Sequence, residues 1–197
     1  LLVTNNTKLW KQAWSLKDHG RDLDIVRNRP KGTGFVWMVN SFGTNHRMNE
    51  IQAAIGRIFL KRLDKMVSRR RKYAAMLDKE FGEMDPLVVT RPSKGIEPAY
   101  YKYYVQVDPK KLKKGLTRDG VLQKLAALGV PCGCGACPEI YREKAFQRQR
   151  KELGFAPQKR LPAARRLGEN CIMLQVHPTL SKECIEYTIE AMKKALE

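Results

Sequence analysis

The sequence has no long apolar run, few cysteines and few acidic residues, and each scarcity excludes a class of protein. No stretch approaches the roughly 20 consecutive apolar residues that a membrane-spanning helix needs, so we do not expect an integral membrane protein. The five cysteines are odd in number and irregular in spacing, which fits reduced thiols better than a disulfide framework. No basic and apolar leader opens the sequence, and we therefore expect a cytoplasmic protein.

The shortage of acidic residues leaves a strongly basic chain. Its 38 Lys and Arg residues outnumber its 20 Asp and Glu residues and give a formal net charge of +18 over 197 residues. Such a charge is typical of proteins that bind nucleic acid, an anionic surface or a phosphorylated small molecule. The cations are scattered in short runs without interleaved aromatic residues. We therefore interpret them as solvated helix faces and expect neither a nucleic acid nor a membrane as a partner.

The first part of the sequence predicts two helices separated by a long loop. Apolar spacing and capping side chains indicate a helix over Lys8–Asp18 and a much longer one over Asn49–Phe81. The longer helix exceeds the usual length, and we expect a bend or break near Val67–Arg70. Residues 20–44, punctuated by glycine and proline, are expected to form a loop. Leu1–Thr4 has the pattern of a strand, which predicts that the chain is a piece of a larger protein cut within a sheet.

From about residue 83 onward, short β-branched and aromatic runs alternate with capped helical segments, which predicts a small α/β layer. The expected strands are Leu87–Val89, Tyr101–Val107, Val130–Cys134 and Cys171–Val176, and the expected helices are Thr117–Leu128, 138–148 and Ser181–Leu196.

Two short segments have residue types that could carry chemistry. Cys132–Cys137 reads Cys-Gly-Cys-Gly-Ala-Cys, and thiolates this close could bind a metal. A closed zinc site usually takes four ligands, often as two separated pairs, so we expect no metal and a turn whose glycines let the backbone approach a ligand. Gly43–Met48 places Asn45, His46 and Arg47 just before the long helix. Backbone amides, the helix dipole and the guanidinium there suit a phosphate or another anion.

The same segments resemble a known enzyme family. Gly43–Gly56, followed by Leu60–Asp64 and Arg69–Arg71, resembles the DegT/DnrJ/EryC1/StrS aminotransferases. Further blocks resemble this family in the same order, and these are Leu2–Asn5, Leu16–Arg21, Tyr101–Val105, Gly129–Pro131, Leu161–Arg165 and His177–Leu180.

The resemblance implies a pyridoxal-phosphate enzyme of fold type I that works as a homodimer with shared active sites. Such enzymes mostly aminate nucleotide-linked keto-sugars from an amino-acid donor, in the biosynthesis of cell-surface polysaccharides or antibiotic sugars. The expected fold class is α/β, the C-terminal part of a fold-type I transferase. Residues 1–66 would be the end of the large cofactor domain with the long helix, and residues 67–197 the small C-terminal α/β domain.

The resemblance also implies roles for individual residues. Asn45 matches the position that reaches across the dimer to the neighbour's cofactor phosphate, and Arg47 is expected to be a second anion contact. The Cys132–Cys137 turn occupies the place of a His-Tyr-Pro stretch beside the substrate, so Cys134 and Gly135 are expected to line the substrate.

The resemblance assigns no catalytic residue to any position of this sequence. The family's Schiff-base lysine, its pyridinium-binding Asp and its main phosphate-binding turn all precede the position of Leu1, and we expect the chain alone to be inactive. Two alternatives stay open at this point. One is a non-catalytic basic binding module derived from the same fold, and the other is a pairing subunit that donates Asn45 and Arg47 to a full-length partner.

Overall fold

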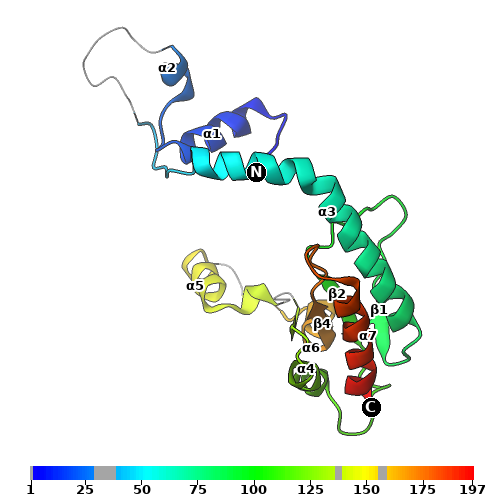
Figure 1. Ribbon diagram of the computed structural model, residues 1–197. Helices are drawn as coiled ribbons and strands as arrows, with labels where there is room; N and C mark the ends of the chain where they lie inside the picture. The colour runs from blue at the N-terminus through cyan, green and yellow to red at the C-terminus, as the bar shows by residue number, and fades with distance from the viewer. Residues whose placement is uncertain (1, 29–38, 136–138, 155–158) are drawn as a thin grey trace. The chain divides into compact units, whose positions relative to one another are not determined.

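The protein divides into two compact units, Leu1–Lys61 and Arg62–Glu197, in the computed structural model (Figure 1). None of the helices that the structure describes is long and apolar enough to cross a membrane. The described residues are 2–28, 39–135, 139–154 and 159–197.

The short helices of the first unit begin at residues whose side chains supply missing backbone partners. α1 (Thr7–Lys17) begins after Asn6, whose Oδ1 accepts a hydrogen bond from the backbone N–H of Leu9 at 3.0 Å. α2 (Leu23–Arg27) begins after Asp22, which caps it in the same way. Such caps satisfy backbone donors that have no partner within the helix. The first predicted helix is thereby confirmed.

The long helix α3 (Glu50–Gly82) extends from the first unit into the second. Its start is a reciprocal cap between two side chains. The N–H of Gln52 donates to Oδ1 of Asn49 at 2.8 Å, and the N–H of Asn49 donates to Oε1 of Gln52 at 3.2 Å. This is the geometry of a capping box, and it fixes where the predicted long helix begins.

No break is present near Val67–Arg70, because α3 is continuous from Glu50 to Gly82. Two of the arginines in this part of the helix donate hydrogen bonds to backbone carbonyl oxygens. Arg69 donates to the carbonyl oxygen of Pro178 at 3.1 Å, and Arg71 donates to that of Pro98 at 3.0 Å. These contacts hold the helix surface to two loops of the second unit.

The second unit is built on a four-stranded antiparallel sheet in the order β1-β2-β4-β3. Alternate residues of the two central strands point into the core, with Val105 opposite Ile172. The strands are β1 (Leu87–Val89), β2 (Tyr103–Val107), β3 (Cys132–Gly133) and β4 (Cys171–Leu174).

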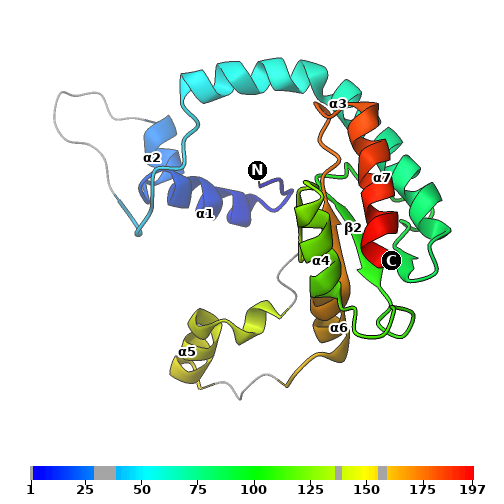
Figure 2. The same ribbon diagram turned by 60° about the horizontal axis from the view of Figure 1, so that its bottom comes forward.

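Helices contribute the other half of this core. α4 (Arg118–Ala127) and α7 (Lys182–Leu196) contact each other beside the sheet (Figure 2), and the second half of α3 joins them. The Phe81 and Tyr103 rings meet edge-on with centroids 6.0 Å apart. The helical part of the core consists of Tyr73, Ala74, Leu77, Phe81, Val121, Leu125, Ile185, Ile189, Ala191, Met192 and Ala195.

The segment between β3 and β4 contains η1 (Ile140–Arg142), α5 (Lys144–Glu152) and α6 (Pro162–Asn170). α6 was not predicted, although Leu161–Arg165 was recognised as a family landmark. The helix expected over 138–148 is instead divided between η1 and α5 where the structure describes it.

Two expectations for the first unit are corrected. Leu2–Thr4 form no strand, because a strand needs a paired neighbour and the described part of this unit supplies none. The expected loop over 20–44 contains α2, since Asp22 provides a helix cap within it. The α/β class itself is confirmed, as capped helices and an antiparallel sheet share one core in the second unit.

Candidate functional site

The candidate anion site is formed where the chain leaving α1 meets the chain entering α3. Four backbone hydrogen bonds join these two segments, which lie about 25 residues apart in the sequence. They run from Thr44 N–H to Leu16 O at 2.7 Å, from His46 N–H to Lys17 O at 3.0 Å, from His19 N–H to Thr44 O at 3.2 Å, and from Asn40 N–H to Gly20 O at 2.9 Å.

Two glycines let the segments approach this closely. His19 and Gly20 both have positive φ, at 61° and 79°, in a tight turn closed by the N–H of Arg21 on the carbonyl oxygen of Asp18. A Cβ on Gly20 would lie 1.7 Å from the carbonyl oxygen of Ser41. A Cβ on Gly43 would lie 2.1 Å from the backbone nitrogen of Gly20. Both positions therefore exclude any side chain.

Asp18 and Arg47 form a bidentate ion pair inside this junction. Arg47 Nε donates to Asp18 Oδ1 and Nη2 donates to Oδ2, each at 2.8 Å. The Asp18 side chain is only 1% exposed, whereas that of Arg47 is 54% exposed. The hydrogen bonds from Arg47 lower the pKa of Asp18 against the opposing effect of burial, and the carboxylate in turn raises the pKa of Arg47. The pair fixes the direction of the guanidinium.

Asn45 lies beside this ion pair with its side chain exposed. Its Oδ1 accepts a hydrogen bond from the N–H of Arg47 at 3.3 Å, and its backbone pairs with that of Asp18. No hydrogen bond from Asn45 Nδ2 to another described residue is present, and Arg47 retains Nη1 as a further donor. An amide N–H and a guanidinium N–H fit a phosphate, which only accepts hydrogen bonds.

The structure thus brings Asn45 and Arg47 together in one turn. Sequence reasoning missed Asp18, the residue that orients Arg47. The only available signal was an acidic residue in the Leu16–Arg21 block, and its burial depends on a contact 29 positions along the chain.

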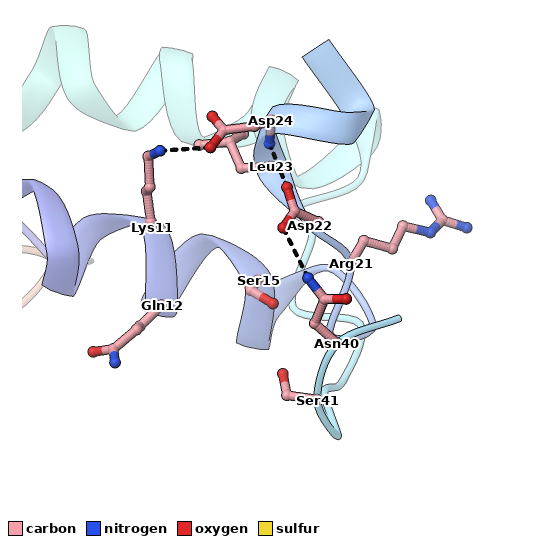
Figure 3. A pocket seen from close by; sticks show the side chains of 9 residues that line it. All are labelled: Lys11, Gln12, Ser15, Arg21, Asp22, Leu23, Asp24, Asn40 and Ser41. Carbon is pink, nitrogen blue, oxygen red and sulfur yellow. Dashed lines mark hydrogen bonds and ion pairs between the residues drawn. The ribbon is translucent and has the colours of Figure 1, made fainter. Parts of the chain in front are cut away.

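A pocket of about 250 Å³ lies next to this junction (Figure 3). Its acidic groups already have partners, because Lys11 Nζ contacts Asp24 Oδ2 at 2.6 Å and Asn40 Nδ2 donates to Asp22 Oδ2 at 2.8 Å. The predicted cofactor residues do not line it. Its lining consists of Lys11, Gln12, Ser15, Arg21, Asp22, Leu23, Asp24, Asn40 and Ser41.

The two predicted substrate residues belong to the second unit and follow β3. Cys134 is exposed, and its carbonyl oxygen accepts a hydrogen bond from Arg118 Nη1 at 3.3 Å. Gly135 has a φ of 85°, which favours glycine. The rest of the predicted turn, residues 136–138, lies outside the described residues.

A charged cluster around Glu139 was not predicted. Arg160 Nε and Nη2 bond its two carboxylate oxygens at 3.0 and 2.6 Å, and the Tyr141 hydroxyl donates to Oε1 at 2.7 Å. These contacts, with Arg160 first, lower the pKa of Glu139 to about 2. The cluster fastens the start of η1 to the chain entering α6.

The sequence and the fold of this chain are similar to those of several known proteins. An aminotransferase of solved structure from Psychrobacter cryohalolentis is 37% identical, with a TM-score of 0.84, over 98% of this chain and 50% of that one. Helicobacter pylori PseC, an aminotransferase involved in the biosynthesis of pseudoaminic acid, has a TM-score of 0.78 at 22% identity, over 98% of this chain and 47% of that one. The spore coat polysaccharide biosynthesis protein SpsC of Bacillus subtilis is 25% identical, over 98% of this chain and 48% of its own length.

The fold is therefore that of the sugar aminotransferases, a class of pyridoxal-phosphate-dependent enzymes. Residues 1–193 match the DegT/DnrJ/EryC1/StrS aminotransferase family, and the chain belongs to that family. It spans about half the length of the relatives it matches. The resemblance and the fold class predicted from the sequence are both confirmed.

Proposed function

We propose that this chain is the C-terminal portion of a pyridoxal-phosphate-dependent aminotransferase that transfers an amino group from an amino acid to a nucleotide-linked keto-sugar. The family match over residues 1–193 supports the reaction type. The polysaccharide and pseudoaminic acid roles in the names of SpsC and PseC support a sugar as the acceptor. The reaction takes place in the cytoplasm, in the synthesis of amino sugars for polysaccharides or antibiotics.

The observation that carries this proposal is the junction of Asn45, Arg47 and Asp18. Asn45 Nδ2 and Arg47 Nη1 bind the phosphate group of the cofactor, and Asp18 holds the guanidinium in place. Asp18 also compensates most of the charge of Arg47, so the phosphate is recognised mainly through directed hydrogen bonds. When bound, the cofactor supplies an electron sink for the substrate carbanion, while the protein positions groups around it.

The phosphate belongs to the cofactor of the neighbouring subunit in a homodimer with shared active sites. Apolar side chains at the start of α3 support an extensive interface for the first unit, since Ile51 and Leu60 are 74% and 70% exposed. Residues 1–66 then correspond to the end of the cofactor domain with the long helix, and residues 67–197 to the small domain, where Cys134 and Gly135 line the substrate. The Schiff-base lysine lies in the remainder of the enzyme, and the chain alone is inactive.

The test uses the enzyme expressed from its complete reading frame. Asn45→Ala removes a hydrogen bond to a charged group, and such bonds contribute about 1.5–3 kcal/mol. We expect pyridoxal phosphate to bind roughly 10- to 100-fold more weakly. The exposed Asn5 is a matched control, because the structure gives it no role at this junction, and Asn5→Ala should bind the cofactor normally.

Equilibrium dialysis with pyridoxal phosphate measures the difference. Equal cofactor affinity in Asn45→Ala and Asn5→Ala would remove Asn45 from the cofactor site and leave the proposal without its structural support.

A further inference from the structure

Two cysteines far apart in the sequence lie near each other at the end of β3. The antiparallel pairing of β3 with β4 sets Gly133 opposite Met173. Because the strands run in opposite directions, two further residues bring the chain to Gly135, next to Cys171 at the start of β4. Cys134 is the residue before Gly135 and so lies beside the start of β4.

One side chain clamps the backbones of both cysteines. Arg118 Nη1 donates to the carbonyl oxygen of Cys171 at 2.7 Å and to that of Cys134 at 3.3 Å. The Arg118 side chain is 13% exposed, so the clamp is largely enclosed. A single nitrogen that contacts both carbonyl oxygens keeps the two backbones adjacent. Disulfide-bonded cysteines need Cα atoms about 4.4–6.8 Å apart, and the shared contact with Arg118 holds the two backbones near each other.

The Cys171 sulfur faces the segment that carries Cys134. A Cβ on Gly135 would lie 2.9 Å from Cys171 Sγ, so the sulfur packs directly on the glycine backbone. Gly135 has a φ of 85° and turns the chain at this point. Cys134 is exposed, whereas Cys171 is half-buried. Burial raises the pKa of Cys171, the charge of Arg118 acts in the opposite direction, and the Cys134 thiol is close enough to raise it further.

We propose that Cys134 and Cys171 form a reversible disulfide when the protein meets hydrogen peroxide, with Cys134 as the thiol that reacts first. The exposed sulfur of Cys134 attacks one peroxide oxygen, the O–O bond breaks, and a sulfenic acid and one water form. The Cys171 sulfur then displaces the hydroxyl group from the Cys134 sulfur, which forms the S–S bond and releases a second water. The two thiols lose two electrons and two protons in total, and the peroxide is reduced to water.

The disulfide would fasten the turn after β3 to the first residue of β4. A dithiol reductant would reverse it. Cys134 is also one of the residues proposed to line the substrate, but the test does not depend on that role, because oxidation is measured on the cysteines themselves.

The experiment treats the reduced protein with hydrogen peroxide, blocks the remaining thiols and maps the tryptic peptides by mass spectrometry. We expect peptide 125–142 to be linked to peptide 167–182 with the loss of two hydrogen atoms. The link should disappear in Cys134→Ser and in Cys171→Ser. It should persist in Cys184→Ser, because Cys184 is exposed in the first turn of α7 and does not belong to β3, β4 or the turn after β3.

Two further variants distinguish this pair from general thiol reactivity. Peptide 125–142 also contains Cys132 and Cys137, so the link must survive Cys137→Ser. Arg118→Met should reduce formation of the link while a sulfenic acid trap still labels Cys134. A link that survives Cys134→Ser, or oxidation that stops at sulfenic acid in the unmodified sequence, would overturn the proposal.

Discussion

The ion pair of Asp18 with Arg47 is predicted to have asymmetric energetics. Removing one partner of a fully buried pair costs about 3–5 kcal/mol, because the other charge is left without compensation. Asp18 is 1% exposed, but Arg47 is 54% exposed and is itself part of the cover over Asp18. Water therefore reaches the carboxylate once the guanidinium is gone. We expect Arg47→Met to lower the free energy of unfolding of the first unit by about 2 kcal/mol.

The opposite substitution should cost less. Asp18→Asn keeps the shape and one acceptor oxygen and leaves a half-exposed guanidinium that water solvates, so we expect a loss of about 1 kcal/mol. In the double variant no charge is buried, and its loss should be smaller than the sum of the two by roughly 1 kcal/mol.

Urea unfolding followed by tryptophan fluorescence reads the first unit selectively, because all three tryptophans of the chain lie between residues 1 and 61. The pH dependence of the unfolding free energy provides a second test of the ion pair. Since Arg47 lowers the pKa of Asp18, the pair stabilises the fold above the usual value of 3.8 and loses this effect as the pH falls through the pKa of the folded state. The deficit of Arg47→Met should therefore shrink in acid. An Asp18→Asn variant less stable than Arg47→Met would refute the reasoning.

Three further perturbations test other parts of the molecule. Gly43→Ala should unfold the junction of the first unit, because the added Cβ would clash with the Gly20 backbone. In Gly56→Ala the added Cβ contacts no other atom, so this substitution should stabilise α3 by about 1 kcal/mol. The urea midpoints of the two variants measure the difference. The contacts that lower the pKa of Glu139 from 4.5 to about 2 stabilise the fold above pH 4.5, and this stabilisation is lost as the pH falls toward 2. The difference in unfolding free energy between the unmodified protein and an Arg160→Met variant should therefore shrink over that interval, as measured by urea titrations. Leu77→Ala in the core should cost about 2–5 kcal/mol in the same assay, read by far-UV circular dichroism.

The sequence predicted best those elements whose signals are local. Three helices begin directly after a capping residue that is visible in the sequence: α1 after Asn6, α4 after Thr117 and α7 after Ser181. Each of these side chains accepts a hydrogen bond from a backbone N–H in the first turn of its helix. The apolar periodicity of α3 is equally local. By contrast, α6 begins after Leu161 without a side-chain cap, and Pro162 at its first position was the local signal of a helix start.

The candidate site was predictable only in part. Asn45 and Arg47 stood out because a recognisable block precedes the long helix. Asp18 could not be assigned, since its ion pair depends on two loops that pack glycine against glycine. The contact of Cys171 with the turn after Cys134 likewise depends on strand register, which a two-residue strand in the sequence does not define.

The central claim is that the complete enzyme performs transamination on pyridoxal phosphate with the help of this chain. The most direct measurement supplies the protein from the complete reading frame with pyridoxal phosphate and a panel of amino acids, and quantifies keto acid released and cofactor converted to its amine form. We predict that at least one amino acid yields keto acid in a one-to-one ratio to bound cofactor. A protein that binds no cofactor and releases no keto acid from any amino acid would contradict the account.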